Sequence, residues 1–341
     1  PTAFLFSSGK WTKVDSVYII KIAPYYYGLA YVGIDCADSA NCIAFGNLDY
    51  TDPINRVTTD GGKTWFTTLR DSSYTTIDEN WNVIQYKPTK VWDVAFPSKS
   101  LCIAVCDSGF YWVSRDILKT WARHKLDTKY GLFRIHFLDE NYGVITELRN
   151  IFITTDGGYI WENIRIPYNN DNNNWVIDDS YFIDKTTIYC VIYSTTEDKA
   201  CYLCKTNDLG ITWEFIQLPH IRPLRLFFLD RFRGWVAGGD HYSLSYYTQL
   251  ILYTSDGGQS WEKQLDTLSG GKRRISKLYF LDENNGFALS YWWTLWKTTN
   301  GGKNWLKDTT IIQNNIIQGV FADIEPISKK KILAITESYK T

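Results

Sequence analysis

The chain has 341 residues, with 36 basic and 37 acidic side chains and a formal net charge of −1. This balance excludes a protein that binds nucleic acid mainly through the phosphate backbone, because such a protein needs a basic face. A hydrophobic content of 45% excludes a disordered chain, and no apolar run is long enough to span a membrane.

One octapeptide recurs along the chain, beginning with Ser or Thr and ending with Trp. Its copies, in chain order, end at Trp65, Trp121, Trp161, Trp213, Trp261 and Trp305, and a shorter form ends at Trp11. The copies recur roughly every 50 residues, a period typical of solenoids and propellers. Two copies depart from the pattern, since Leu118 replaces the second Gly in one and Asn300 replaces the Asp in another.

Each unit between copies is predicted to contain four short strands. The first strands lie in 132–143, 225–234 and 276–286, and second strands follow at 144–148, 235–239 and 287–293. A third strand enters the octapeptide and a fourth leaves its Trp. Short strands with turns at regular spacing indicate antiparallel β structure. Seven such units predict an all-β, seven-bladed β-propeller of four-stranded antiparallel blades.

The two ends of the chain are expected to share the last blade. Segments 319–328 and 331–338 supply two strands, and the first 20 residues supply the other two. We therefore expect residues 1–341 to form a single domain, with the ring closed by a blade made of about 1–20 and 316–341.

The octapeptide resembles the Asp-box, or BNR repeat, of sialidases, sortilins and related propellers. Its Asp accepts backbone N–H bonds in a tight turn, Gly takes a positive φ, and Trp packs the hairpin onto the sheet. We interpret the following residues as structural: Asp60, Asp116, Asp156, Asp208, Asp256 and Asn300, with Trp65, Trp121, Trp161, Trp213, Trp261 and Trp305. The carboxylate pairs Asp139-Glu140 and Asp282-Glu283 are interpreted as turn residues rather than a general acid and base.

A longer stretch of each unit looks like the photosystem II assembly/stability-factor family. Residues 36–46 (CADSANCIAFG) and 96–106 (FPSKSLCIAVC) carry this likeness best. The resemblance implies a luminal propeller that assists assembly, and it specifies the fold more closely than the function.

The connections that vary in length are expected to open on one face of the propeller. Loops that vary on a constant scaffold usually carry function. The binding residues predicted on this face are Trp81, Tyr86, Trp175, Tyr242, Tyr246, Tyr247, Arg273 and Arg274. Aromatic residues with Arg can anchor a protein partner or stack on sugars, and the alternative is that they pack their own loops.

The seven cysteines include a pair, Cys36 and Cys42, that flanks a short turn. Opposed strand residues suit a disulfide, so we predict a Cys36–Cys42 bridge, with free buried thiols as the alternative. Cys190 could pair with Cys201 or Cys204 across another hairpin. The sequence contains no metal-ligand spacing beyond the isolated Cys201-x-x-Cys204, and no metal or cofactor is predicted.

These observations predict a non-catalytic binding or assembly module for a protein or glycan, with an undetermined oligomeric state and no nucleic-acid partner. We expect it to be extracytoplasmic, with a signal peptide removed, because the chain begins at Pro1, lacks Met and carries a predicted disulfide. One alternative is a sialidase-type glycoside hydrolase, although Arg165-Ile166-Pro167 lies at the end of a strand rather than ahead of the first Asp-box. Another is a structural subunit of a surface or filament assembly.

Overall fold

A computed structural model provides the three-dimensional structure of the protein. It describes residues 2–7, 10–16, 21–22, 25–26, 29–48, 52–71, 74–77, 83–86, 89–168, 174–196, 200–219, 221–239, 246–270, 274–290, 294–308, 320–328 and 331–337. Contacts divide the chain into two compact units. Unit 1 is Pro1–Phe133 with Asn315–Thr341, and unit 2 is Arg134–Asn314.

Unit 1 contains two four-stranded antiparallel sheets and one three-stranded sheet. The first is β2-β1-β31-β30, made of Lys10–Ser16, Thr2–Ser7, Lys331–Glu337 and Val320–Ser328. The second is β10-β11-β12-β13, made of Val91–Ser98, Leu101–Cys106, Phe110–Ser114 and Ala122–Lys125, with the short helix η1 at Asp107–Gly109. The three-stranded sheet is β5-β6-β7, made of Leu29–Cys36, Cys42–Leu48 and Asp52–Thr58.

Two small hairpins complete the described part of unit 1. They are β3-β4, made of Lys21–Ile22 and Tyr25–Tyr26, and β8-β9, made of Tyr74–Ile77 and Val83–Tyr86. The two ends of the chain share a sheet, because β1 pairs antiparallel with β31 from Thr2↔Thr336 to Ser7↔Lys331. The structure thus contains the pairing of the chain ends expected from the sequence. That the whole chain forms one domain stays a prediction.

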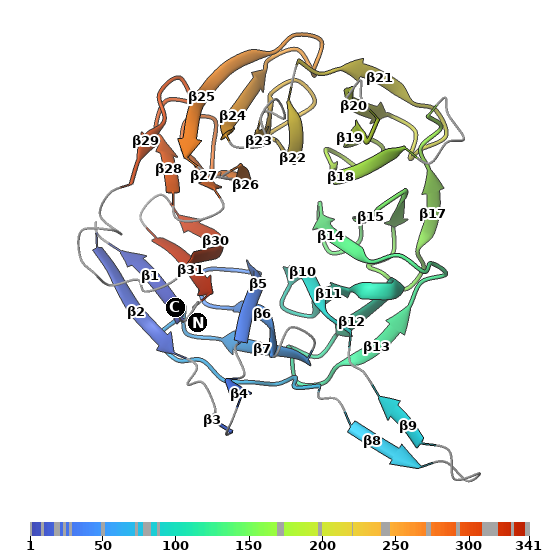
Figure 1. The fold of residues 1–341 in the computed structure, drawn as a ribbon, viewed down its shortest axis with the longest axis vertical. Coiled ribbons are helices and arrows are strands. Elements are labelled where there is room, and N and C mark those ends of the chain that lie inside the picture. The colour runs from blue at the N-terminus through green and yellow to red at the C-terminus, as the bar shows by residue number, and fades with distance from the viewer. Residues whose placement is uncertain are drawn as a thin grey trace. The chain divides into compact units, whose positions relative to one another are not determined.

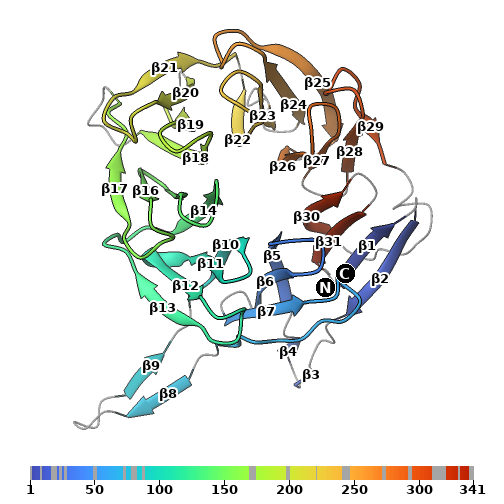
Figure 2. The ribbon, with the colours of Figure 1, turned by 180° about the vertical axis from the view of Figure 1, so that it is seen from behind.

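Unit 2 contains four sheets of four antiparallel strands, in chain order. They are β14–β17 (Leu132–Phe137, Gly143–Glu147, Asn150–Thr154, Glu162–Arg165), β18–β21 (Trp175–Phe182, Ile188–Ser194, Cys201–Thr206, Glu214–Gln217), β22–β25 (Arg222–Phe228, Gly234–Gly239, Tyr246–Thr254, Glu262–Gly270) and β26–β29 (Ile275–Phe280, Gly286–Ser290, Thr294–Thr298, Leu306–Lys307). Within this unit the first strand of each sheet lies on the inner side and the fourth on the outer side (Figures 1 and 2).

The prediction of seven four-stranded blades is wrong. The described residues form six four-stranded antiparallel sheets, and the unit expected to supply another has only the three strands β5, β6 and β7. Where its fourth strand was expected, only two isolated bridges occur, Val57↔Phe66 and Ile54↔Arg70. The architecture is therefore an all-β propeller with six blades of four strands.

A buried side chain explains why the fourth strand of that sheet is missing. Asn55 has no exposed surface, and its Oδ1 accepts hydrogen bonds from the backbone N–H groups of Thr68 (2.9 Å) and Leu69 (3.0 Å). Its Nδ2 donates to the Thr68 hydroxyl over 3.0 Å. The side chain thus bonds backbone groups that would otherwise join a ladder, so the regular pairing is interrupted between the two bridges.

The core lies between successive sheets. One cluster joins the second and third sheets of unit 2 through residues such as Tyr189, Val191, Leu226 and Val236. Second strands such as Leu101–Cys106 and Gly234–Gly239 are buried along their whole length. In unit 2, Gly234–Gly239 packs on one face against the preceding sheet through Val236 and on the other against the following sheet through Trp235 and Ala237. These second strands therefore consist of apolar and small residues, whereas the outer strand Glu162–Arg165 is mostly exposed.

Candidate functional site

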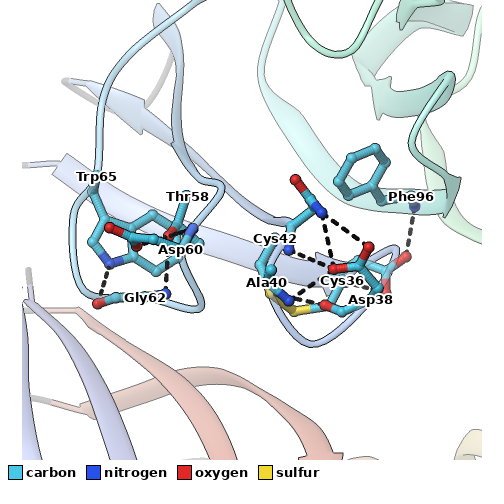
Figure 3. Close-up of a disulfide and its surroundings, with 11 residues drawn as sticks. Cys36, Asp38, Ala40, Cys42, Thr58, Asp60, Gly62, Trp65 and Phe96 are labelled. Carbon is cyan, nitrogen blue, oxygen red and sulfur yellow. Dashed lines mark hydrogen bonds between the residues drawn. A yellow bond between two sulfur atoms is a disulfide. The ribbon is translucent and has the colours of Figure 1, made fainter.

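The octapeptide folds as a tight turn centred on its Asp (Figure 3). In the first copy, Asp60 Oδ1 accepts hydrogen bonds from the N–H groups of Lys63 and Thr64, and the Thr64 hydroxyl donates to Oδ2 over 2.6 Å. Gly62, at φ 90°, donates its N–H to the Thr58 hydroxyl, and Trp65 Nε1 donates to the Gly62 carbonyl. The Thr64 hydroxyl and N–H, with further hydrogen bonds, lower the pKa of Asp60 to about 2. This carboxylate is occupied in holding the turn.

Other copies of the octapeptide form similar bonds, and the copies that contain Asn300, Leu118 and Ile160 differ from the first at those positions. Asn300 accepts the N–H of Asn304 through its amide oxygen, so the amide replaces the carboxylate. Leu118 takes the glycine position with φ 61° and is almost fully buried. In the copy ending at Trp161, Ile160 stands where Thr64 and Thr212 donate a hydroxyl, so that bond to Asp156 cannot form. The Asp-box residues therefore serve local structure.

The described part of the structure does not include the side chains of six of the eight predicted binding residues. Trp81, Tyr242 and Arg273 lie outside the described residues. Tyr86 lies in β9, and Tyr246 and Tyr247 lie in β24, where they pair with Gly270 and Ser269, but only their backbone is described. Their role in binding stays a prediction.

Trp175, the first residue of β18, packs against Tyr168, which follows β17, and against Tyr202 on β20. Its ring centroid lies 3.9 Å from that of Tyr168 and 5.7 Å from that of Tyr202, and it is partly buried against the core. Trp175 and Tyr168 thus pack against each other across their connecting segment, and a role of Trp175 in binding stays a prediction. Arg274 is half-buried just before β26, at the same end of the sheets.

The inner strands of unit 2 bring charged side chains together. Asp178 on β18 interacts electrostatically with Arg222, Arg134 and Arg225, which come from β22 and β14. Tyr193, at the end of β19, interacts with Asp178, Arg222 and Arg274. We call these four arginines, with Asp178 and Tyr193, the basic cluster. The neighbouring Asp179 is used structurally, because its Oδ2 accepts the N–H of Leu226 from the next sheet over 3.0 Å.

The geometry of the basic cluster is best defined around Arg222. Its Nη2 donates to the Tyr193 hydroxyl over 2.8 Å, and its guanidinium carbon lies 4.4 Å from the centroid of the Tyr193 ring. Burial raises the pKa of Tyr193, and Asp178 adds to this shift while Arg222 and Arg274 oppose it. Burial also raises the pKa of Asp178 to about 6, despite the three arginines. Arginines outnumber carboxylates here, so the cluster is suited to an anionic group.

Sequence reasoning missed the basic cluster, although the repeat contains a signal for it. In each of the four sheets of unit 2, a charged residue stands three positions before the Phe near the end of the inner strand. These residues are Arg134, Asp179, Arg225 and Lys277. In a strand that position faces the same side in every unit. Aligning the units by that Phe would have shown a buried charged position in strands that otherwise read as apolar.

In unit 1, buried carboxylates on first strands accept backbone hydrogen bonds from the neighbouring sheet, as Asp179 does in unit 2. Asp35 Oδ2 accepts the N–H of Phe96 over 2.6 Å, and Asp323 Oδ2 accepts the N–H of Ile34 over 3.2 Å. Burial raises the pKa of Asp35 to about 6, against the opposing effect of two backbone hydrogen bonds, and Asp93 and Asp323 add to the increase. These groups link neighbouring sheets of unit 1.

The predicted disulfide is present. Cys36 and Cys42 are bonded across the turn between β5 and β6, as Figure 3 shows. Cys102, Cys106, Cys190, Cys201 and Cys204 are free and buried. Cys190 faces Cys204 directly across β19 and β20, so the register selects Cys204 over Cys201 as its neighbour.

Within the described ranges, no group of three or more His, Cys, Asp or Glu residues is arranged to hold a metal ion. In the same part of the chain, no helix is long and apolar enough to cross a bilayer.

The sheets and their repeated turns define the class of protein as a β-propeller, and comparisons with solved structures agree. The chain is similar to YCF48 from Cyanidioschyzon merolae, at 13% identity and a TM-score of 0.58, over 93% of this chain and 98% of that chain. A structure of YCF48 bound to D1 peptide matches at 15% identity with the same TM-score, over 93% and 97% of the two chains.

An enzyme is also among the similar structures. The GH74 xyloglucanase from Xanthomonas campestris matches at 14% identity and a TM-score of 0.59, over 86% of this chain and 46% of that chain. At such identities the similarity shows the fold alone. No family model and no curated protein sequence matches the chain, so membership of an Asp-box family stays a prediction.

Proposed function

We propose that this chain is a non-catalytic binding or assembly module of the Asp-box type that holds a protein partner at the basic cluster. The observation that carries the proposal is the convergence of Arg134, Arg222, Arg225 and Arg274 around Asp178 and Tyr193. Arg recognises carboxylates through two parallel hydrogen bonds, so an acidic segment of a partner is the favoured ligand. The similarity to YCF48, one structure of which is bound to D1 peptide, supports a protein partner.

We further propose that the protein acts outside the cytoplasm. The Cys36–Cys42 disulfide supports this, because disulfides persist in oxidising compartments.

A pull-down from the native source tests the proposed function. We expect the wild type to capture a partner and the double variant Arg222→Glu/Arg274→Glu to lose it, while circular dichroism shows that the double variant is still folded at the assay temperature. Lys185→Glu is the matched control, because Lys185 is exposed in the turn between β18 and β19, at the other end of the sheet. Equal capture by the wild type and the double variant would exclude the basic cluster as the binding site.

A further inference from the structure

Asp178 occupies an unusual position in the repeat. In β5, β10, β18, β22, β26 and β30 the pairing with the next strand shifts near the start of the strand, which leaves one residue out of the register there, and β10 and β30 shift a second time near their ends. Those residues are, in chain order, Val32, Trp92, Asp178, Leu224, Ser276 and Ala322. Among these six strands only β18 has a charged residue at the bulge, and bulges commonly redirect a side chain at functional sites.

The bulge leaves Asp178 incompletely satisfied. Its Oδ2 is buried and accepts no hydrogen bond from any described residue. Arg222 Nε is likewise buried without an acceptor in the described structure, although Nη2 of the same side chain donates to Tyr193. Orphaned buried polar atoms are costly, so the presence of these two on Asp178 and Arg222 calls for an explanation.

One carboxylate ligand would satisfy both atoms, provided that Asp178 carries a proton. The ligand would accept the Arg222 Nε hydrogen, and the protonated Asp178 would donate its O–H to the ligand in a charge-assisted hydrogen bond. An ionised Asp178 has no hydrogen to donate and would repel the ligand while holding the arginines by attraction. Occupancy of the cluster and protonation of Asp178 are therefore linked.

We propose that Asp178 gates the basic cluster, so that binding of a carboxylate from the partner takes up one proton at Asp178. This inference rests on the proposed function and adds its regulation.

The groups that face Asp178 support a transition near neutral pH. They are Arg134 from β14, Arg222 and Arg225 from β22, Tyr193 from β19, and Asp179 on its own strand. Because burial outweighs the arginines, the pKa of Asp178 rises from 3.8 to about 6. His136, two residues from Arg134 on β14, stacks on Tyr181, and burial lowers its pKa to about 3, so it stays neutral across this range.

Fluorescence anisotropy with a rhodamine-labelled hexaglutamate peptide tests the gate. The full chain is titrated with this probe at pH 6 and pH 8, at constant ionic strength. We expect the wild type to bind about fiftyfold more tightly at pH 6, because the protonated fraction of a group with a pKa near 6 falls from about one half at pH 6 to about one hundredth at pH 8. Asp178→Asn keeps a donor and removes the charge, so its affinity should match that of the wild type at pH 6 and vary less than about twofold between the two pH values.

The controls separate this inference from the proposed function. Arg222→Gln should lose the probe at both pH values, and Glu140→Gln, on an exposed turn, should behave like the wild type. If the wild type binds equally at both pH values and Arg222→Gln does not bind, the gate is wrong while the binding site stands. If the wild type and Asp178→Asn fail to bind at either pH, both proposals fail. Melting temperatures confirm that each variant is folded.

Discussion

Arg222 and Tyr193 form a paired contact in which the Nη2 group of Arg222 donates to the Tyr193 hydroxyl over 2.8 Å. The guanidinium carbon also lies 4.4 Å from the centroid of the same ring. One tyrosine therefore orients one arginine through both its hydroxyl and its π face. Arg222 comes from the start of β22 and Tyr193 from the end of β19, so the pair joins two successive sheets.

Tyr193→Phe should weaken this pair. The ring contact remains but the hydroxyl acceptor is lost, so we expect the free energy of unfolding to fall by about 1 kcal/mol. Urea denaturation measures this change. Tyr159→Phe is the control, because Tyr159 is 72% exposed in a turn. Equal effects of the two substitutions would contradict a structural role for the Tyr193 hydroxyl.

Asn55→Ala should destabilise unit 1 strongly. It removes the acceptor for the N–H groups of Thr68 and Leu69 at a site with no exposed surface. Leaving buried donors unsatisfied costs about 1–3 kcal/mol. Urea denaturation should show a loss in that range, whereas Asn141→Ala, in an exposed turn, should change stability by less than about 0.5 kcal/mol. A loss as small as that of Asn141→Ala would mean that Asn55 does not hold this segment.

Ile160→Thr should stabilise the protein. The introduced hydroxyl can donate to Asp156 as Thr212 donates to Asp208, and the substitution also removes a large apolar side chain that is 66% exposed. We expect a gain of about 0.5 kcal/mol in the free energy of unfolding. The reverse change, Thr212→Val, should lower the urea midpoint and raise the pKa of Asp208, which the Thr212 hydroxyl helps to lower to about 2. An NMR titration of Asp208 measures the second effect, and an unchanged pKa there would argue against this role of the hydroxyl.

His136 should destabilise the protein in mild acid. Burial lowers its pKa from 6.5 in the unfolded chain to about 3, so the unfolded state binds a proton first. Above pH 6.5 the histidine is neutral in both states and does not reduce the free energy of unfolding. As the pH falls from 6.5 toward 3, only the unfolded state takes up the proton, so the free energy of unfolding decreases. Between pH 7 and pH 5 this loss is at most about 2 kcal/mol.

His136→Phe tests this effect. Asp35 and Asp178 have raised pKa values and act in the opposite direction, so the quantity to compare is the difference between variant and wild type. Thermal unfolding should show that His136→Phe gains stability relative to the wild type as the pH falls from 7 to 5. A constant difference would show that His136 titrates normally.

The free cysteines should resist alkylation in the folded protein. Burial raises the pKa of the Cys102, Cys190 and Cys204 thiols well above normal and that of Cys106 to about 12. Since the thiolate is the nucleophile, iodoacetamide at pH 8 should label none of them until denaturant is added. Mass spectrometry of peptides from native and denatured samples measures the labelling. Rapid labelling of Cys190 in the native sample would mean that its sheet opens locally.

The local features of the fold were predictable from sequence because their bonds are local. The Asp60 turn is closed by hydrogen bonds to residues three and four positions away, so the sequence of the octapeptide is sufficient to predict the turn. The Cys36–Cys42 bridge spans one tight turn for the same reason. The number of four-stranded sheets was not predictable in this way, because Asn55 bonds residues 13 and 14 positions away and so removes a strand that the pattern of the repeat predicts.

The candidate site depends on still longer distances. Sequence pattern drew attention to Arg274 in a variable loop, but nothing local indicates that Arg134, Arg222 and Arg225 surround Asp178. Those residues meet only because successive sheets pack with their first strands on one side, and because a bulge places Asp178 out of register with its partner strand. The sequence alone thus determined the strands, the turns and the disulfide, which rest on short-range hydrogen bonds and pairing. Only the tertiary structure decided where buried charge gathers, because burial and electrostatic coupling depend on neighbours that are distant in the chain.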